Sequence, residues 1–224
     1  MNIPSIHVHD EIHALGIDVN FIVFKNIQNK RSDDSFNSFR QETLSEIISS
    51  LSKESIKTDT VLDGYRDLRT AVGISRSKNI CSSEALLNYL LKKQTLPDIN
   101  LLVNIYNLLS VATHISIGAH DIHAIEGRVN FKITSGDETF LPMGVEEPVK
   151  INKGEYAYID DKEILCRLDY RQCNKTKITE SSECCLFIVQ GNANTNKETI
   201  NKVTQDLIQL VEKYCDGEVE KVQY

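Results

Sequence analysis

The chain has 224 residues, of which 41% are hydrophobic and 25% charged, so it can bury a full hydrophobic core. A formal net charge of -7 means that the surface as a whole repels polyanions. This excludes broad, nonspecific nucleic-acid binding and leaves room only for a local RNA contact. No run approaches the roughly 20 apolar residues of a membrane helix, and the start lacks the residue order of a signal peptide. We therefore expect a cytosolic protein without a membrane partner.

The cysteines and histidines show no spacing typical of a metal site. The six cysteines include no C-x-x-C pair, which argues against a disulfide framework and a zinc site. We predict reduced thiols, with Cys184 and Cys185 on opposite faces of one strand. His7, His9 and His13 are close enough to chelate, but nothing downstream supplies a matching cluster. Glycine motifs that bind phosphates or dinucleotides are also missing, so we expect neither a metal nor a cofactor.

The first half of the chain reads as one strand followed by helices. Hydrophobic and polar residues alternate over residues 16–25, which predicts a strand. The polar residues 53–60 are predicted to be a loop. Hydrophobic residues recurring every three or four positions predict four helices, over residues 35–53, 62–72, 82–93 and 99–114.

From Gly127 the hydrophobic period changes from about 3.6 to about two, which indicates strands. The predicted strands cover residues 128–134, 154–160, 163–170 and 184–191. An amphipathic helix over residues 196–214 follows them. Together these elements predict an α+β fold, with a mixed and mostly antiparallel sheet and flanking helices, in a single domain over residues 1–224.

The predicted helix over residues 99–114 is apolar but carries a line of uncharged polar side chains. Steps of three or four residues place them on one face, and they are Asn100, Asn104, Asn107, Ser110 and His114. No Lys or Glu occurs between Leu101 and His120, so we expect this helix to be buried on almost every side. A buried amide without partners costs about 1 to 3 kcal/mol. These five side chains, called the polar stripe below, must therefore find hydrogen-bond partners. The partners are either neighbouring backbone groups or a ligand in a wet pocket.

A second group of polar residues lies between residues 166 and 179. If this segment is one strand, Arg167, Asp169 and Arg171 point the same way. Lys175 and Lys177 follow, which concentrates positive charge in an otherwise acidic protein. Two interpretations stay open. One is an exposed strand with internal Arg and Asp pairs, and the other is a clamp for phosphate or carboxylate, which Arg binds in bidentate geometry.

Several segments, in this order, resemble the paired B-three/B-four module of the phenylalanyl-tRNA synthetase beta subunit, and more closely its free-standing bacterial relatives. The segments are SSEALLNYLL, LPDINLLVNIYNLLS, GAHDIHAIEGRVNFK, KGEYAYIDDKEILCRLDYRQCNKTKIT and CCLFIVQG. The resemblance covers roughly residues 64–191 and implies the same fold. In the synthetase this module is implied to hold an editing pocket, where a wrongly attached amino acid is hydrolysed from tRNA.

The resemblance also assigns positions to this pocket. Asn107 falls on the Asn of the family's pocket helix, Asn104 on the Asp of that helix, and Asp121 on the Asp of the following motif. Gly118 stands where the family has a pocket His, and an acidic family position falls near Ile188. These departures mean that tyrosine editing does not transfer to this chain.

A third departure concerns the family's glycine-rich turn, which the stretch from Arg167 to Gln172 replaces. The free-standing relatives share the R-x-x-x-R-Q pattern formed here by Arg167, Arg171 and Gln172. The shared pattern suggests a different ligand rather than decay of the site.

The first hypothesis for function is a trans-acting deacylase that hydrolyses a mischarged aminoacyl-tRNA. Its catalytic residues would be Asn107, Asp121 and His120, with Asp121 or His120 as the base. Substrate-binding residues would be Asn104, Ser110, Gly118, Arg167, Arg171 and Gln172, and Lys175 and Lys177 would contact the tRNA acceptor end.

Two alternatives stay open. One is a noncatalytic module that binds a tRNA end or an amino-acid-like small molecule in the same pocket. The other is a partner-binding subunit in which these residues are structural. Aminoacylation is not expected, because the resemblance covers only the editing module. The oligomeric state and the identity of the amino acid are not predicted.

Overall fold

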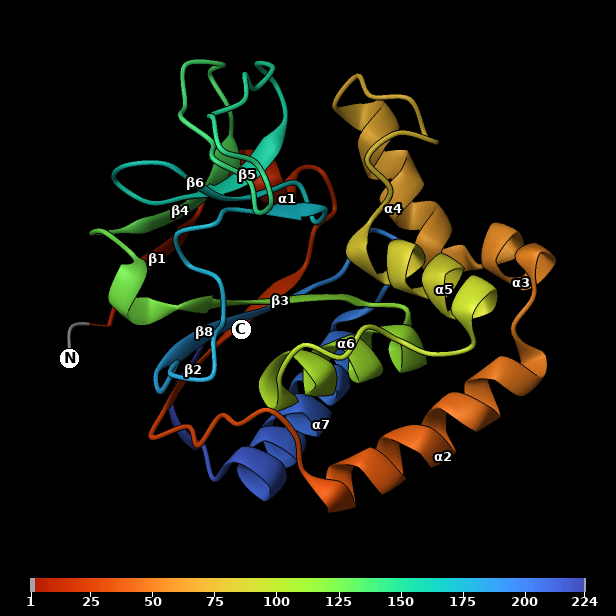
Figure 1. Ribbon diagram of the computed structural model, residues 1–224. Helices are drawn as coiled ribbons and strands as arrows, with labels where there is room; N and C mark the ends of the chain where they lie inside the picture. Colours follow the sequence, from red (N-terminus) through yellow and green to blue (C-terminus); the bar gives the residue numbers. More distant parts are fainter. Residues whose placement is uncertain (1–2, 224) are drawn as a thin grey trace.

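A computed structural model describes residues 3–223 and shows two sheets with flanking helices (Figure 1). It confirms the predicted α+β class with mostly antiparallel strands, but the strands divide between two sheets instead of forming one. Five short strands form one sheet, in the order β1 (Ile6–Val8), β4 (Val129–Ile133), β5 (Tyr156–Ile159), β6 (Ile164–Arg167) and β7 (Arg171–Gln172). Only the β1–β4 pair in this sheet is parallel.

The second sheet has four antiparallel strands and contains the most hydrophobic segments of the chain. Their order is β3 (Ser116–Asp121), β8 (Cys185–Gln190), β2 (Val19–Lys25) and β9 (Glu218–Gln223). Every residue of β8 is buried, because this strand is central and both of its faces are covered. Cys184 lies outside β8, so the prediction that Cys184 and Cys185 fill opposite faces of one strand is wrong.

The helices are α1 (Asp10–His13), α2 (Asp34–Ser50), α3 (Lys53–Thr58), α4 (Thr60–Ala71), α5 (Ser82–Lys93), α6 (Leu101–Thr113) and α7 (Lys197–Cys215), with a 3-10 turn η1 (Ile122–Ala124). Helices α2 to α7 cover one face of the four-stranded sheet and one side of the molecule, whereas α1 contacts β4 of the five-stranded sheet. In Figure 1, α6 and α7 lie below the four-stranded sheet and the five-stranded sheet lies above it. Residues 101–111 of α6 are all buried, as the sequence predicts. Among the described residues, no helix combines the length and hydrophobicity needed to cross a bilayer.

The prediction of a loop over residues 53–60 is wrong, because residues 53–58 form helix α3. Ser52 and Ser55 form a reciprocal capping box at its start. At its end, the Arg66 guanidinium donates to the carbonyl oxygens of Ile56 at 2.9 Å and Lys57 at 3.0 Å. A polar, mostly exposed sequence therefore becomes helical because both of its ends are capped.

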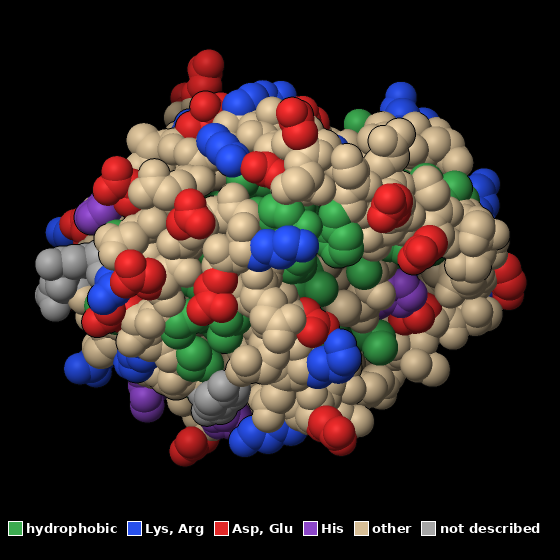
Figure 2. Space-filling view, turned by 90° about the horizontal axis from the view of Figure 1, so that it is seen from below, with side chains coloured by type: hydrophobic (Ala, Val, Ile, Leu, Met, Phe, Trp, Pro, Cys, Tyr) green, Lys and Arg blue, Asp and Glu red, His purple; other side chains and the backbone are tan. Residues whose placement is uncertain are grey.

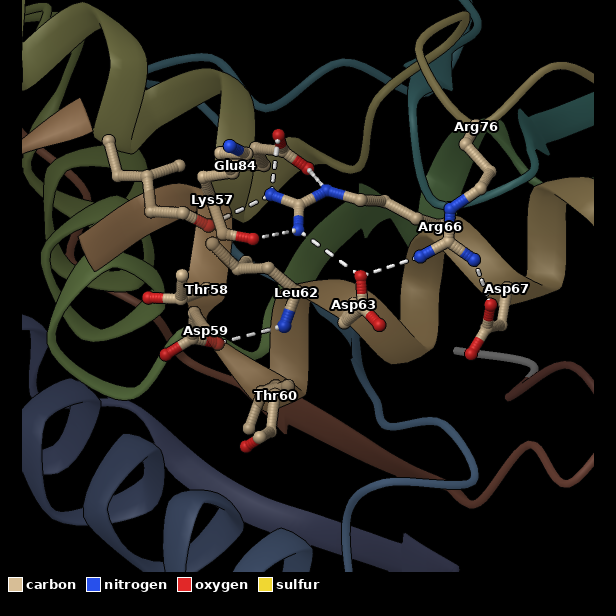
Figure 3. Close-up of polar contacts among 12 residues, drawn as sticks. Lys57, Thr58, Asp59, Thr60, Leu62, Asp63, Arg66, Asp67, Arg76 and Glu84 are labelled. Carbon is tan, nitrogen blue, oxygen red and sulfur yellow. Dashed lines mark hydrogen bonds and ion pairs between the residues drawn. The ribbon is translucent and has the colours of Figure 1, made fainter. Parts of the chain in front are cut away.

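Figure 3 shows that the same guanidinium joins α3, α4 and α5. Arg66 Nη2 lies 2.9 Å from Glu84 of α5, and Arg66 Nη1 lies 3.5 Å from Asp63 of its own helix. Arg76 also pairs with Asp63, at 2.6 Å, and with Asp67. Acidic and basic groups are matched throughout this cluster, so its role is to hold the three helices together.

The predicted strand over residues 163–170 ends early, in a tight hairpin. Strand β6 stops at Arg167 and pairs with β7 so that Arg167 lies opposite Arg171. Leu168 adopts a left-handed backbone conformation with φ of 55°, which is uncommon for a residue other than glycine. Asp169 lies in the turn and is buried. The prediction that Arg167, Asp169 and Arg171 share one face of a single strand is therefore wrong.

Candidate functional site

A cavity of about 230 Å³ lies where α6 meets β3, β8 and the β6–β7 hairpin. Its walls are mainly apolar, as in most small-molecule sites. The lining residues are Ser82, Ile99, Val103, Tyr106, Asn107, Ser116, Ile117, Gly118, His120, Tyr158, Cys166, Asp169, Tyr170, Gln172, Ile188 and Gln190. Residues from both sheets and from α6 converge here, although they are far apart in the sequence.

The β3 wall follows from strand geometry. Alternate residues of a strand point to the same side, which brings Ser116, Gly118 and His120 to one face. A Cβ atom built on Gly118 meets nothing within 4 Å, so this position faces open space. The glycine thus leaves a gap in the wall where any other residue would place a side chain.

The charged side chain in the wall, Asp169, belongs to a buried ion pair with Arg69 of α4. Its carboxylate accepts from both terminal nitrogens of Arg69, from the Tyr156 hydroxyl at 2.8 Å and from Gln190 Nε2 at 3.3 Å. Three of these donors share Oδ2, and the fourth, Arg69 Nη2, contacts Oδ1. The buried Arg69 guanidinium therefore balances the charge of Asp169 and holds its carboxylate in place.

Gln190 is held in one orientation by this network. Its Oε1 accepts from the Tyr158 hydroxyl at 2.6 Å, while its Nε2 donates to Asp169. The Tyr65 hydroxyl donates to the Gln190 carbonyl oxygen and accepts from the Ser116 backbone N–H at 3.0 Å. The network therefore fixes the polar floor of the cavity through hydrogen bonds within the protein.

Three neighbouring polar groups in the cavity wall have no partner within residues 3–223. The Ser116 hydroxyl oxygen is fully buried and makes no hydrogen bond. The Asn107 side chain is 9% exposed, and neither its amide nor the Tyr106 hydroxyl has a partner there. Burial raises the pKa of Tyr106, so its hydroxyl stays protonated as a donor. The unsatisfied buried hydroxyl of Ser116 costs about 1 to 3 kcal/mol unless a bound molecule or water meets it, and the polar atoms of Asn107 and Tyr106 are open to the same molecule.

His120 is held in place by two polar contacts to Nδ1. Thr176 Oγ1 lies 2.7 Å from this nitrogen, and Gln172 Nε2 lies 3.1 Å from it. Gln172 Nε2 also donates to the Ala119 carbonyl oxygen. Because an amide nitrogen only donates, Nδ1 accepts and the ring proton resides on Nε2. Burial lowers the pKa of His120 to about 4, so the ring is neutral at physiological pH.

Comparison with protein families identifies the family of the chain. Residues 65–216 match the family model described as the B3/4 domain, which is more than half of the sequence. The chain belongs to the B3/4 domain family. This confirms the resemblance to the paired B-three/B-four module that the sequence motifs indicate. All the lining residues fall inside the matched range, whereas the assignment of residues 1–224 to a single domain stays a prediction.

The fold of this B3/4 protein is similar to the crystal structure of an N-terminal fragment of the phenylalanyl-tRNA synthetase beta subunit from Pyrococcus horikoshii. The TM-score is 0.52 and the sequence identity is 10%. The match covers 97% of this chain and 52% of the other, so the B3/4 protein spans about half the length of that chain. At this identity the similarity shows a shared fold and nothing more. No curated protein matches the sequence.

In the B3/4 protein the polar stripe of α6 divides into structural residues and one cavity residue. Asn100 caps α6, and Asn104 accepts from the Ile99 N–H at 3.0 Å and donates to Asp98 at 2.7 Å. Ser110 donates to the Ile115 carbonyl oxygen at 2.6 Å, and His114 ends the helix and contacts Asp59 at 2.8 Å. Of the five stripe residues, Asn107 lines the cavity, whereas protein groups satisfy the other four, as the first interpretation predicts; a ligand partner for Asn107 stays a prediction.

Other residues predicted for the site lie outside the cavity of the B3/4 protein. Asp121 accepts from the His123 N–H at 3.0 Å and from Ser182 at 2.7 Å, so it caps η1. Arg167 forms a bidentate pair with the buried carboxylate of Glu155, at 2.5 and 2.7 Å. Neither Asp121 nor Arg167 lines the cavity, whereas His120, Gly118 and Gln172 do.

The predicted basic patch is largely neutralised. Lys175 Nζ lies 2.8 Å from Asp160 and 3.3 Å from Glu126. Lys177 is exposed, and Arg171 donates to the Met143 carbonyl oxygen at 2.8 Å. On the face that Figure 2 shows, Lys and Arg side chains are interspersed with Asp and Glu around a central group of hydrophobic side chains, so this face carries no extended basic patch.

Acid is expected to destabilise the protein through His120. The pKa is 6.5 without burial and about 4 in the folded protein, so between these pH values the unfolded state binds more protons. The contribution of His120 to the free energy of unfolding is thus complete above about pH 6.5 and is lost as the pH falls toward 4. Within this window the free energy of unfolding changes with a slope that approaches about 1.4 kcal/mol per pH unit from this residue. Urea unfolding of wild type and His120→Asn across this window measures the slope. Equal slopes in the two proteins would rule out the assignment.

Proposed function

We propose that this B3/4 protein binds the aminoacyl end of a tRNA in the cavity and hydrolyses the ester bond of the aminoacyl-tRNA. The observation that carries the proposal is the group of unpartnered polar atoms on Asn107, Tyr106 and Ser116 beside apolar walls. An ester with its amino-acid side chain has a matching composition, with polar carbonyl and amine atoms attached to a mainly apolar body. The resemblance to the editing module of a tRNA synthetase supports the same class of substrate.

The substrate's side chain is expected to be uncharged and small. The Asp169 carboxylate is neutralised by Arg69, and the His120 ring is neutral. A charged side chain inside the cavity would therefore lack a counter-ion, which is strongly unfavourable in a mostly apolar site, whereas the α-amino group of the substrate lies with the ester near the open mouth and stays in contact with solvent. The volume of about 230 Å³ lies below the roughly 300–1,000 Å³ of sites for drug-sized ligands. It suits an aminoacyl group without its nucleoside.

In this mechanism the protein supplies hydrogen-bond donors for the transition state, and it does not supply the general base. A water oxygen attacks the carbonyl carbon, and negative charge develops on the carbonyl oxygen. The bond between the carbonyl carbon and the ribose oxygen then breaks, and the ribose oxygen leaves with the proton that the water has lost. The Asn107 amide, the Tyr106 hydroxyl and the Ser116 hydroxyl supply donors for the developing charge. The neighbouring ribose hydroxyl of the substrate is the group that activates the water, because Asp169 is paired with Arg69 and Asp121 lies outside the cavity.

A second candidate function is noncatalytic binding of the same aminoacyl end. Two observations favour it. Asp121 lies outside the cavity and caps η1, and Asp169, the one carboxylate among the lining residues, is paired with the buried Arg69 cation. Binding and turnover must therefore be measured separately.

A panel of aminoacyl-tRNAs distinguishes the two functions. We expect wild type to deacylate at least one member that carries an uncharged side chain, and Asn107→Ala to lower that rate about a hundredfold, the usual cost of one oxyanion donor. The matched control is Asn88→Ala, which makes the same change on the exposed side of α5. Binding by wild type without turnover would establish the noncatalytic module. Absence of both binding and turnover would contradict both functions.

A further inference from the structure

Two large hydrophobic side chains stand exposed at the mouth of the cavity. Tyr170 of the β6–β7 turn is 37% exposed and Ile99, just before α6, is 48% exposed, yet both line the cavity. A residue that both lines a cavity and faces solvent lies at its opening. Met143, 40% exposed, lies beside β7 of the same hairpin, because its N–H donates to the Gln172 carbonyl oxygen at 2.9 Å.

The hairpin anchors the residue before Tyr170 and leaves the Tyr170 side chain partly exposed. The preceding residue, Asp169, is tied to Arg69, and its carbonyl oxygen accepts from the Ser82 N–H at 3.0 Å. The left-handed turn at Leu168 lets Asp169 point inward while Tyr170 stays at the surface. No other aromatic ring within residues 3–223 stacks on Tyr170. The fold thus presents an aromatic face beside the opening.

We propose that Tyr170 is the stacking platform for the terminal nucleobase of the RNA whose aminoacyl group enters the cavity. The inference rests on the proposed function. A cavity of about 230 Å³ accommodates the aminoacyl group only, so the attached nucleoside has to remain outside, at the mouth. Proteins commonly bind the bases of single-stranded RNA ends by stacking them on aromatic side chains.

The charge next to this platform fits an RNA end. Arg167 is neutralised by Glu155, and Lys175 by Asp160. Arg171 follows Tyr170 directly and contacts a backbone carbonyl oxygen, and within the described residues no carboxylate pairs with it. Its remaining guanidinium donors are available for a phosphate. In a protein with a net charge of -7, this unneutralised cation beside an exposed ring favours a local contact with nucleotide.

The test compares two sets of probes by calorimetry. The first set is 3′-aminoacylamino-3′-deoxyadenosine, with an amide in place of the ester, carrying leucine, phenylalanine, tyrosine or threonine. The second set is the same amino acids as N-methylamides, which lack the nucleoside. We expect Tyr170→Ala to weaken binding of the first set about tenfold and to weaken binding of the second set by much less, because Tyr170 lines the cavity only at its mouth. Tyr170→Phe keeps the ring and should bind both sets like wild type.

Tyr89→Ala is the matched control, since Tyr89 is 40% exposed on α5 and does not line the cavity. Equal binding of the nucleoside probes by wild type and Tyr170→Ala would overturn the inference and leave the proposed function intact. Equal weakening of both probe sets would also overturn it, because Tyr170 would then contact the aminoacyl group. If wild type binds neither set, the proposed function fails and the inference fails with it.

Discussion

Asp169→Ala is expected to lower the free energy of unfolding by about 3–5 kcal/mol, the usual cost of removing one partner from a buried ion pair. Arg69 is 1% exposed, and its guanidinium would be left with the Asn79 carbonyl oxygen and the Tyr156 hydroxyl as acceptors. Neither acceptor carries the negative charge that now balances the cation. Urea denaturation monitored by circular dichroism measures the loss.

The same substitution is expected to abolish ligand binding, because Asp169 anchors the turn that forms one wall of the cavity. Lys202→Ala serves as the control, since it breaks an exposed ion pair with Asp206 on α7. Exposed pairs contribute little, so its unfolding midpoint should stay near that of wild type. An Asp169→Ala protein as stable as the Lys202→Ala protein would show that the buried pair does not hold the hairpin.

Gly118→Val is expected to remove ligand binding while leaving the fold intact. The new Cβ meets nothing within 4 Å, so the side chain enters the cavity without a clash and occupies the space of the aminoacyl group. Glycine inside a strand is less stable than a residue with a side chain by roughly 0.5–1 kcal/mol, so the variant should unfold at the same or a higher urea concentration. Calorimetry with the amide probes and urea unfolding measure the two effects.

Gly118→Ala provides a graded control, because it adds a single methyl group and should weaken binding by less than Gly118→Val does. Probe binding by Gly118→Val equal to that of wild type would show that the ligand does not occupy this cavity. A large loss of stability would show instead that the space beside Gly118 is filled in the folded protein.

Elements with a strong local pattern could be predicted from the sequence. The helix predicted over residues 82–93 is α5, whose serine start and leucine spacing are both visible in the sequence. The predicted strand over residues 184–191 contains β8. The signal for it is a run of hydrophobic and β-branched residues that ends at a glycine. In both segments the burial pattern follows from residues within a few positions of each other.

Elements whose stability comes from distant partners could not be predicted. Strand β3 follows α6 with little alternation of hydrophobic and polar residues, and it forms because it pairs along its whole length with β8. Strand β9 lies at the sheet edge, is mostly exposed, and was likewise not predicted. Helix α3 depends on Arg66, which lies in the next helix.

The sequence predicts only part of the candidate site, because distant partners position most of its residues. The helical spacing of α6 places Asn104 and Asn107 on one face, but it does not reveal that Asp98 binds Asn104 and leaves Asn107 without a partner. The partner of Asp169 is Arg69, 100 positions earlier in the chain, and no local pattern connects the two. Ser116 was missed, although its alternation with Gly118 and His120 in one strand was a usable signal.

The side-chain amide signals of Asn107 test the central claim most directly. In protein labelled with ¹⁵N-asparagine, titration with the amide probes is expected to shift the Asn107 side-chain signals. The Asn104 signals should stay in place as an internal control, because that amide is already bound to Asp98 and the Ile99 N–H. Saturating probe that leaves the Asn107 signals unmoved would contradict the assignment of this cavity as the binding site for the aminoacyl end.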